Sequence, residues 1–191
     1  MLVLKFLKQQ KLVKISNDII DINFDDCVKI LLKYNLIEYN GELFRISALN
    51  YGGLFKYNKA NETGIPGYVL VNTATQEAKF VELNDSIKYS PSAYWSYDLK
   101  RHLRNEYPSY MFGEFFFEID EEGNPYYVSS VYDKKVGVFG GTVVIGAIVT
   151  DPVSGDSVYY ELEEIPQWVD YVFPGDLICE LYNIAYKNIN G

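Results

Sequence analysis

Histidine and cysteine are scarce in this chain of 191 residues: there is one histidine, His102, and there are two cysteines, Cys27 and Cys179. Zinc and other transition-metal sites need several His, Cys, Asp or Glu donors at close ligand spacing. Two distant cysteines give no disulfide framework, which favours reduced thiols and leaves their pairing open. The sequence therefore predicts no metal, no cofactor and a cytoplasmic protein.

Long hydrophobic runs are absent as well. The longest uncharged apolar run, residues 136–149, is shorter than the roughly 20 residues that cross a bilayer, and glycines interrupt it. Residues 1–10 interleave lysine with apolar residues and lack the continuous apolar segment and cleavage site of a signal peptide. We expect no membrane span, and the apolar run fits buried strands instead.

Positive charge is in short supply over most of the chain. The net charge is −9, divided into +3 for residues 1–60 and −12 for the remainder. Phosphate contacts dominate the affinity of proteins for nucleic acids, so the acidic body argues against nucleic-acid binding. The same charge suits a basic protein partner.

Residues with catalytic potential are equally few. A Ser-His-Asp or Cys-His arrangement would have to use His102, and the neighbouring Arg101 and Arg104 disfavour its protonated state. Residues 137–142 lack the Lys-Ser/Thr pair of a phosphate loop, and residues 120–124 lack the ligand pattern of an EF-hand. We therefore predict that the chain is not an enzyme.

What the sequence does contain is a pair of similar segments, residues 67–83 and 146–162, which align without a gap. Each has an apolar strand, a polar turn and a second strand, which predicts a β-hairpin. The matched positions include Gly67 and Gly146, Asn72 and Asp151, Glu77 and Asp156, and Phe80 and Tyr159.

Further elements are expected around these hairpins. Ser90 and Pro91 predict the start of a helix over residues 91–105. The expected buried face of this helix consists of Trp95, Leu99, His102 and Leu103. Strands are expected over residues 43–47, 53–57, 114–120 and 125–132, and helices over residues 164–172 and 174–184. This order predicts an α+β fold with a duplicated antiparallel β-sheet-plus-helix unit, residues 41–110 and 111–191.

Residues 1–40 are expected to form a small α/β appendage. A short helix is predicted over residues 2–8, a strand over 12–16 and a second helix over 24–34. The hairpin that follows turns at Asn40 and Gly41 and, with this helix, resembles the end of a winged-helix domain. Two aspartates open the candidate recognition helix, where a DNA reader presents Arg, Lys, Asn or Gln. Packing or dimerisation is the preferred interpretation, and a winged-helix-type regulator remains an alternative.

The paired hairpins carry a resemblance to a known family. With the stretches IKYSPSAYWSYDLKRHLRNEYP (87–108), FFFEIDEEGNPYYV (115–128), GVFGG (137–141) and IPQWVDYVFPGDLI (165–178), they resemble PepSY-like repeats. Such repeats form the soluble region of uncharacterised membrane-associated proteins of Gram-positive bacteria. The resemblance implies a fold and no catalytic residues. A free-standing copy is interpreted as a captured domain, such as a phage-borne or regulatory binder acting on a host protein.

Aromatic residues are the most abundant surface candidates, with 18 tyrosines and 11 phenylalanines. Such side chains anchor many protein interfaces, which favours a non-catalytic protein-binding or inhibitory module of open oligomeric state. The alternative is an acidic mimic of nucleic acid that blocks a basic protein, which requires an exposed carboxylate row. The row would consist of Glu114, Glu118, Asp120, Glu121 and Glu122; the candidate partner-binding residues are Tyr94, Trp95, Tyr97, Tyr160, Trp168 and Tyr171.

Overall fold

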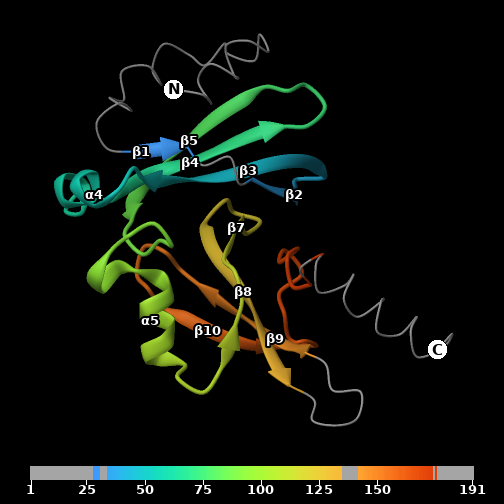
Figure 1. Ribbon diagram of the computed structural model, residues 1–191. Coiled ribbons are helices and arrows are strands. Elements are labelled where there is room, and N and C mark those ends of the chain that lie inside the picture. Colours follow the sequence, from blue (N-terminus) through green and yellow to red (C-terminus); the bar gives the residue numbers. More distant parts are fainter. Residues whose placement is uncertain (1–27, 31–33, 135–141, 174, 176–191) are drawn as a thin grey trace, which may run out of the picture.

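Two antiparallel sheets dominate the protein (Figure 1). The computed structural model describes residues 28–30, 34–134, 142–173 and 175. Few helices accompany the sheets, so the predicted α+β class is confirmed. No helix in these residues is both long enough and apolar enough to span a bilayer.

The first sheet is built on the long strand β3 (Glu42–Tyr51). Two short strands, β1 (Val28–Ile30) and β2 (Asn35–Tyr39), both pair with β3, and β4 (Ile65–Asn72) pairs with it and with β5 (Ala78–Ile87). The β2–β3 turn has positive φ at Asn40 and at Gly41, which is the backbone that an Asn-Gly hairpin turn requires. The hairpin predicted at this position is therefore confirmed.

The second sheet has the corresponding arrangement around strand β8 (Pro125–Lys134). The short strands β6 (Met111–Phe112) and β7 (Phe116–Ile119) both pair with β8, and β9 (Thr142–Thr150) pairs with it and with β10 (Ser157–Glu161). The strand order β10-β9-β8-β6 thus corresponds to β5-β4-β3-β1 in the first sheet.

The structure contains both hairpins that the similar segments predict. Gly67 pairs with Glu82, and Gly146 pairs with Glu161, so the two hairpins share one register. At each tip, the first turn residue donates its N–H to the carbonyl five residues later, from Asn72 to Glu77 and from Asp151 to Asp156, both at 2.9 Å. The side-chain oxygens of these two residues accept backbone N–H groups inside the turn. This local chemistry explains why the two sequences fold alike.

The inner faces of the two sheets share one hydrophobic core. Residues from both sheets meet in it, among them Ile46 and Leu70 of the first sheet and Phe117 and Ile148 of the second. Polar bonds join the sheets at its edges: Asn35 Nδ2 donates to the Phe117 carbonyl at 3.0 Å, and the Tyr68 hydroxyl donates to the Gly123 carbonyl at 2.7 Å. Because the apolar contacts and these bonds cross between the sheets, each sheet supports the other.

Two helices lie at the edges of this arrangement (Figure 1). Helix α4 (Leu54–Ala60) buries Tyr57 and Ala60, and helix α5 (Leu99–Glu106) buries Leu99 and Leu103 in the shared core. The 3₁₀ turn η1 (Trp95–Tyr97) precedes α5. The expected burial of Leu99 and Leu103 is confirmed.

The structure corrects four predicted elements. Residues 28–30 form a strand, where a helix was predicted over 24–34, because β3 extends beyond β2 and offers its edge to β1. Residues 53–57 were predicted as a strand, and they enter helix α4 because apolar Tyr57 and Ala60 recur at helical spacing. The short helix and the strand predicted over residues 2–8 and 12–16 lie outside the described residues, as does nearly all of the helix predicted over 174–184.

The other two corrections concern helix ends. The helix predicted over residues 91–105 begins only at Leu99, because the Asp98 side chain caps it by accepting the Arg101 N–H at 3.0 Å. Residues 164–172 form turns instead of the predicted helix, since a carboxylate and not a helical carbonyl accepts the N–H groups of Asp170 and Tyr171. The domain boundaries at 40/41 and 110/111 stay predictions. Strands β2 and β3, which lie on either side of the boundary at 40/41, belong to one sheet.

Candidate protein-binding surface

The segment that enters helix α5 is closed around Ser90, whose side chain is fully buried. The Ser90 N–H donates to the Tyr97 carbonyl at 3.2 Å, and the Ser90 carbonyl accepts the Leu99 N–H at 3.3 Å. The Ser90 hydroxyl lies 2.9 Å from that of Ser92, which in turn accepts the N–H of Tyr51 on β3 at 3.1 Å. These bonds tie both ends of the 90–99 loop together and anchor the loop to the first sheet.

Tyrosine side chains also hold the 90–99 loop, through contacts with helix α4. Tyr57 of helix α4 donates its hydroxyl to the Tyr94 carbonyl at 2.9 Å, and the two rings lie 5.4 Å apart. Tyr57 also packs edge-on against Tyr51, with ring centroids 4.9 Å apart. Burial raises the pKa of the Tyr57 hydroxyl, and the hydrogen bond to Tyr94 partly opposes this increase. The hydroxyl therefore stays a neutral donor that connects α4 to the loop.

Trp95 lies at the tip of this fixed loop and is turned outward. Its side chain is 63% exposed, although the helical pattern predicted it on a buried face. Its backbone φ is +60°, a conformation that costs a bulky residue about 1–2 kcal/mol. A strained backbone persists only when the surroundings determine it, and the bonds around Ser90 provide that determination.

Further apolar side chains are exposed on helix α4, whose Tyr57 contacts this loop. Phe55 of helix α4 is 86% exposed, and Leu54 beside it is also exposed. Tyr94, which contacts Tyr57 of the same helix, is 37% exposed. We name Leu54, Phe55, Tyr94 and Trp95 the aromatic ridge. Leu54 and Phe55 were missed because residues 53–57 were predicted as a strand; the helical spacing of Leu54, Tyr57 and Ala60 was the available signal.

The remaining candidate residues do not belong to the ridge. Tyr97 packs edge-on against Tyr89, with ring centroids 5.2 Å apart. Tyr160 and Trp168 pack on the outer face of the second sheet, where Trp168 lies 4.8 Å from Tyr126. Tyr171 stacks on Phe116 at 4.3 Å. The structure thus brings Tyr94 and Trp95 together and places Tyr160, Trp168 and Tyr171 in a separate region, where a role in partner binding stays a prediction.

That separate region is held by a buried carboxylate. Glu118 of β7 is fully buried, and its two oxygens accept the backbone N–H groups of Asp170 at 2.7 Å and of Tyr171 at 3.0 Å. Burial raises the pKa of Glu118 to about 7, and the two N–H bonds oppose that increase. Asp170 in turn accepts the Glu38 N–H at 3.2 Å, so this segment touches both sheets. The sequence had suggested Glu118 only as one of the exposed carboxylates of a nucleic-acid mimic, so its burial was not predicted.

The surroundings of His102 offer it a structural role. Its Nε2 lies 2.8 Å from the Gly155 carbonyl oxygen, which can only accept, so Nε2 carries the proton. Ser154 lines the same open hollow, and its hydroxyl donates to Asp151 at 3.0 Å. The serine–histidine hydrogen bond of a nucleophilic site is therefore not formed here. Within the part of the chain that the structure describes, no group of three His, Cys, Asp or Glu side chains could hold a metal ion.

No model of a protein family matches the chain, and no curated protein matches it.

Proposed function

We propose that this protein is a non-catalytic binding module that docks on another protein through the aromatic ridge. The observation that carries the proposal is Trp95, an exposed indole held on a strained backbone by a hydrogen-bonded loop. Burying one large apolar side chain contributes about 1.5–3 kcal/mol, and tryptophan is prominent among the residues that dominate binding energy. A pre-ordered loop also loses little conformational entropy when it binds.

We further propose that the two sheets descend from one duplicated, PepSY-like unit. Their corresponding strand orders and the shared register of Gly67 and Gly146 support this origin. On this proposal the fold is a scaffold, and the partner is recognised where the halves differ. The 90–99 part of the aromatic ridge is such a place, since this loop leads from β5 of the first sheet into helix α5 and on to the second sheet.

No structural observation favours the two alternative functions, a nucleic-acid mimic and a winged-helix regulator. The carboxylate row of a nucleic-acid mimic is broken, because Glu118 is fully buried and Asp120 is 8% exposed. Asp120 instead accepts turn N–H groups from Glu122 and Asn124. The candidate recognition helix of a winged-helix regulator is replaced by a strand at residues 28–30.

Affinity capture with matched variants tests the protein-binding function. The immobilised protein, a Phe55→Ser/Trp95→Ser variant and a Val158→Ser/Phe173→Ser control are exposed to lysate of the source organism. Val158 and Phe173 are each 49% exposed, so the control removes two exposed apolar side chains outside the ridge, with a smaller total area. We expect one protein to be retained by the native chain and the control and lost from the ridge variant, by a factor of at least ten.

Circular dichroism on all three proteins verifies that the ridge variant keeps its fold. Equal retention by the ridge variant would contradict the aromatic ridge as the binding surface. Retention of no protein by the native chain would contradict a protein-binding function.

A further inference from the structure

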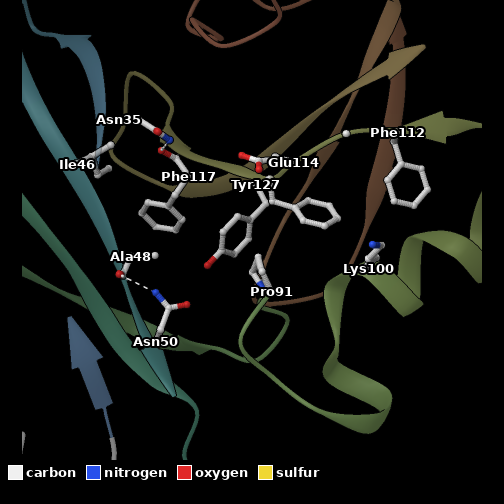
Figure 2. Close-up of a pocket in the computed structure, with 12 residues that line it drawn as sticks. Asn35, Ile46, Ala48, Asn50, Pro91, Lys100, Phe112, Glu114, Phe117 and Tyr127 are labelled. Atoms are coloured by element: carbon white, nitrogen blue, oxygen red, sulfur yellow. Dashed lines mark hydrogen bonds between the residues drawn. The ribbon is translucent and has the colours of Figure 1, made fainter. Parts of the chain in front are cut away.

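A pocket of about 490 Å³ lies between the two sheets, on the side of helix α5 (Figure 2). This volume falls in the range of about 300–1,000 Å³ that is typical of small-molecule sites. The second sheet contributes an aromatic wall with Phe112, Phe115, Phe117 and Tyr127, and β3 contributes Ile46 and Ala48. The pocket thus has the mostly apolar lining of a ligand site.

The aromatic wall is firmly placed. Phe117 packs against Tyr127 with ring centroids 5.2 Å apart, and Phe112 lies 6.1 Å from Phe115. The Tyr127 side chain is buried in the shared core. Since neighbouring groups hold these rings, the cavity does not depend on a ligand to order its wall.

A few polar groups interrupt the apolar lining. The Asn50 amide reaches it from β3, where it donates a long hydrogen bond of 3.4 Å to the Ala48 carbonyl. Lys100 reaches it from helix α5, near Phe112 and Pro91 (Figure 2). Glu114 also lines the pocket, and this residue has an interaction partner.

Charge decides which kind of ligand fits. Among the described residues, Lys100 forms no ion pair. A second cation lies close by, because the Arg104 guanidinium is 4.7 Å from the centroid of the Phe112 ring. Positive charge at one end of an apolar cavity favours an anionic headgroup on an apolar body.

From this lining and charge we propose that the pocket binds a small amphipathic carboxylate. Its hydrocarbon body lies between β3 and the aromatic wall, and its carboxylate pairs with the Lys100 ammonium. This site is distinct from the aromatic ridge and does not depend on the proposed function.

Binding of a homologous series tests the proposal. Hexanoate, octanoate and decanoate are titrated into the full chain by isothermal calorimetry, with 1-octanol as the uncharged probe. Each methylene that enters the pocket should tighten binding about fourfold, until the chain outgrows the cavity. Octanoate should bind about tenfold more tightly than octanol, because only the carboxylate pairs with Lys100.

Three variants separate the site from other surfaces. Lys100→Gln should weaken octanoate about tenfold and leave octanol unchanged, while Lys88→Gln, a control at an exposed lysine outside the pocket, should change neither. Ala48→Leu should abolish binding of both probes by filling the cavity. Circular dichroism verifies the fold of Ala48→Leu, and the exposed Lys100→Gln change tests the site without altering the core.

Three results would overturn the proposal. They are the absence of saturable octanoate binding to the native chain, equal octanoate affinity in Lys100→Gln and Lys88→Gln, and unchanged binding by a folded Ala48→Leu variant.

Discussion

The carboxylate of Glu118 is buried between strand β7 and the segment that ends the described second half. Neither of its two bonds is to a side chain; both donors are backbone N–H groups of residues outside regular structure. One buried side chain therefore holds the segment around Asp170 and Tyr171, which forms neither a strand nor a helix. The same two bonds use the N–H groups that a helix over residues 164–172 would have needed.

This carboxylate predicts a pH dependence of stability. Burial raises the pKa of Glu118 from its ordinary value of 4.5 to about 7 in the folded chain. Between these values the folded state binds more protons than the unfolded state, so the free energy of unfolding falls as pH rises. The loss is at most about 3 kcal/mol and is complete above pH 7.

Urea unfolding of the native chain and of Glu118→Gln between pH 5 and pH 8 measures this effect. Glutamine does not titrate, so we expect a flatter profile, and its amide N–H₂ opposes one backbone donor and lowers stability at pH 5. Glu121→Gln, at an exposed glutamate of the nearby turn, is the control and should keep the native slope. A native slope in Glu118→Gln would show that another group is responsible.

At the scale of elements, the two hairpins rest on equivalent glycines. A Cβ added to Gly67 would fall on the carbonyl oxygen of Val81, and one added to Gly146 would fall on that of Tyr160. Each glycine also lies against the aromatic ring that the matched Phe80 or Tyr159 supplies. Both positions therefore need glycine for close approach of the neighbouring strand and not for an unusual φ.

We expect Gly67→Ala and Gly146→Ala to destabilise the protein by similar amounts, each above about 2 kcal/mol, because a backbone atom must move. Gly175→Ala is the matched control, since no atom of the described residues lies within 4 Å of its added Cβ. Thermal unfolding compares the three variants. A mild effect at one glycine and a severe one at the other would contradict the shared register as the cause.

Elements also show where sequence patterns suffice. Both hairpins and the Asn40-Gly41 turn could be predicted because glycine, asparagine and aspartate act within a few residues of themselves. Strand β1 could not be predicted, because it occupies the edge of β3, a strand distant in the sequence. Helix α4 had a local signal in its apolar spacing, and packing of Tyr57 on Tyr51 and Tyr94 decided between helix and strand. Tertiary contacts of this kind override local propensity.

For the whole molecule, the shared core predicts one cooperative unfolding transition. Apolar residues of both sheets form a single cluster, and Asn35 and Tyr68 bond across it, so neither half keeps its burial alone. Trp95→Phe leaves Trp168 on the second sheet as the single indole, and Trp168→Phe leaves Trp95 beside the first.

We expect both indoles and the far-UV circular dichroism to report the same urea midpoint, after allowance for the stability change of each substitution. The circular dichroism midpoint of each variant is its internal control. Two separate transitions would instead support independent halves with a boundary near residues 110/111.

Composition and short-range pattern were enough to establish the α+β class, the paired hairpins, the acidic charge and the burial of Leu99 and Leu103. These properties follow from residue content and from interactions within a few residues. Long-range packing was needed to show that Trp95 is exposed, that Glu118 is buried, and that the two sheets leave a pocket beside Lys100. The physical reason is that exposure and cavities depend on which distant segments pack together, and a local sequence pattern does not specify those partners.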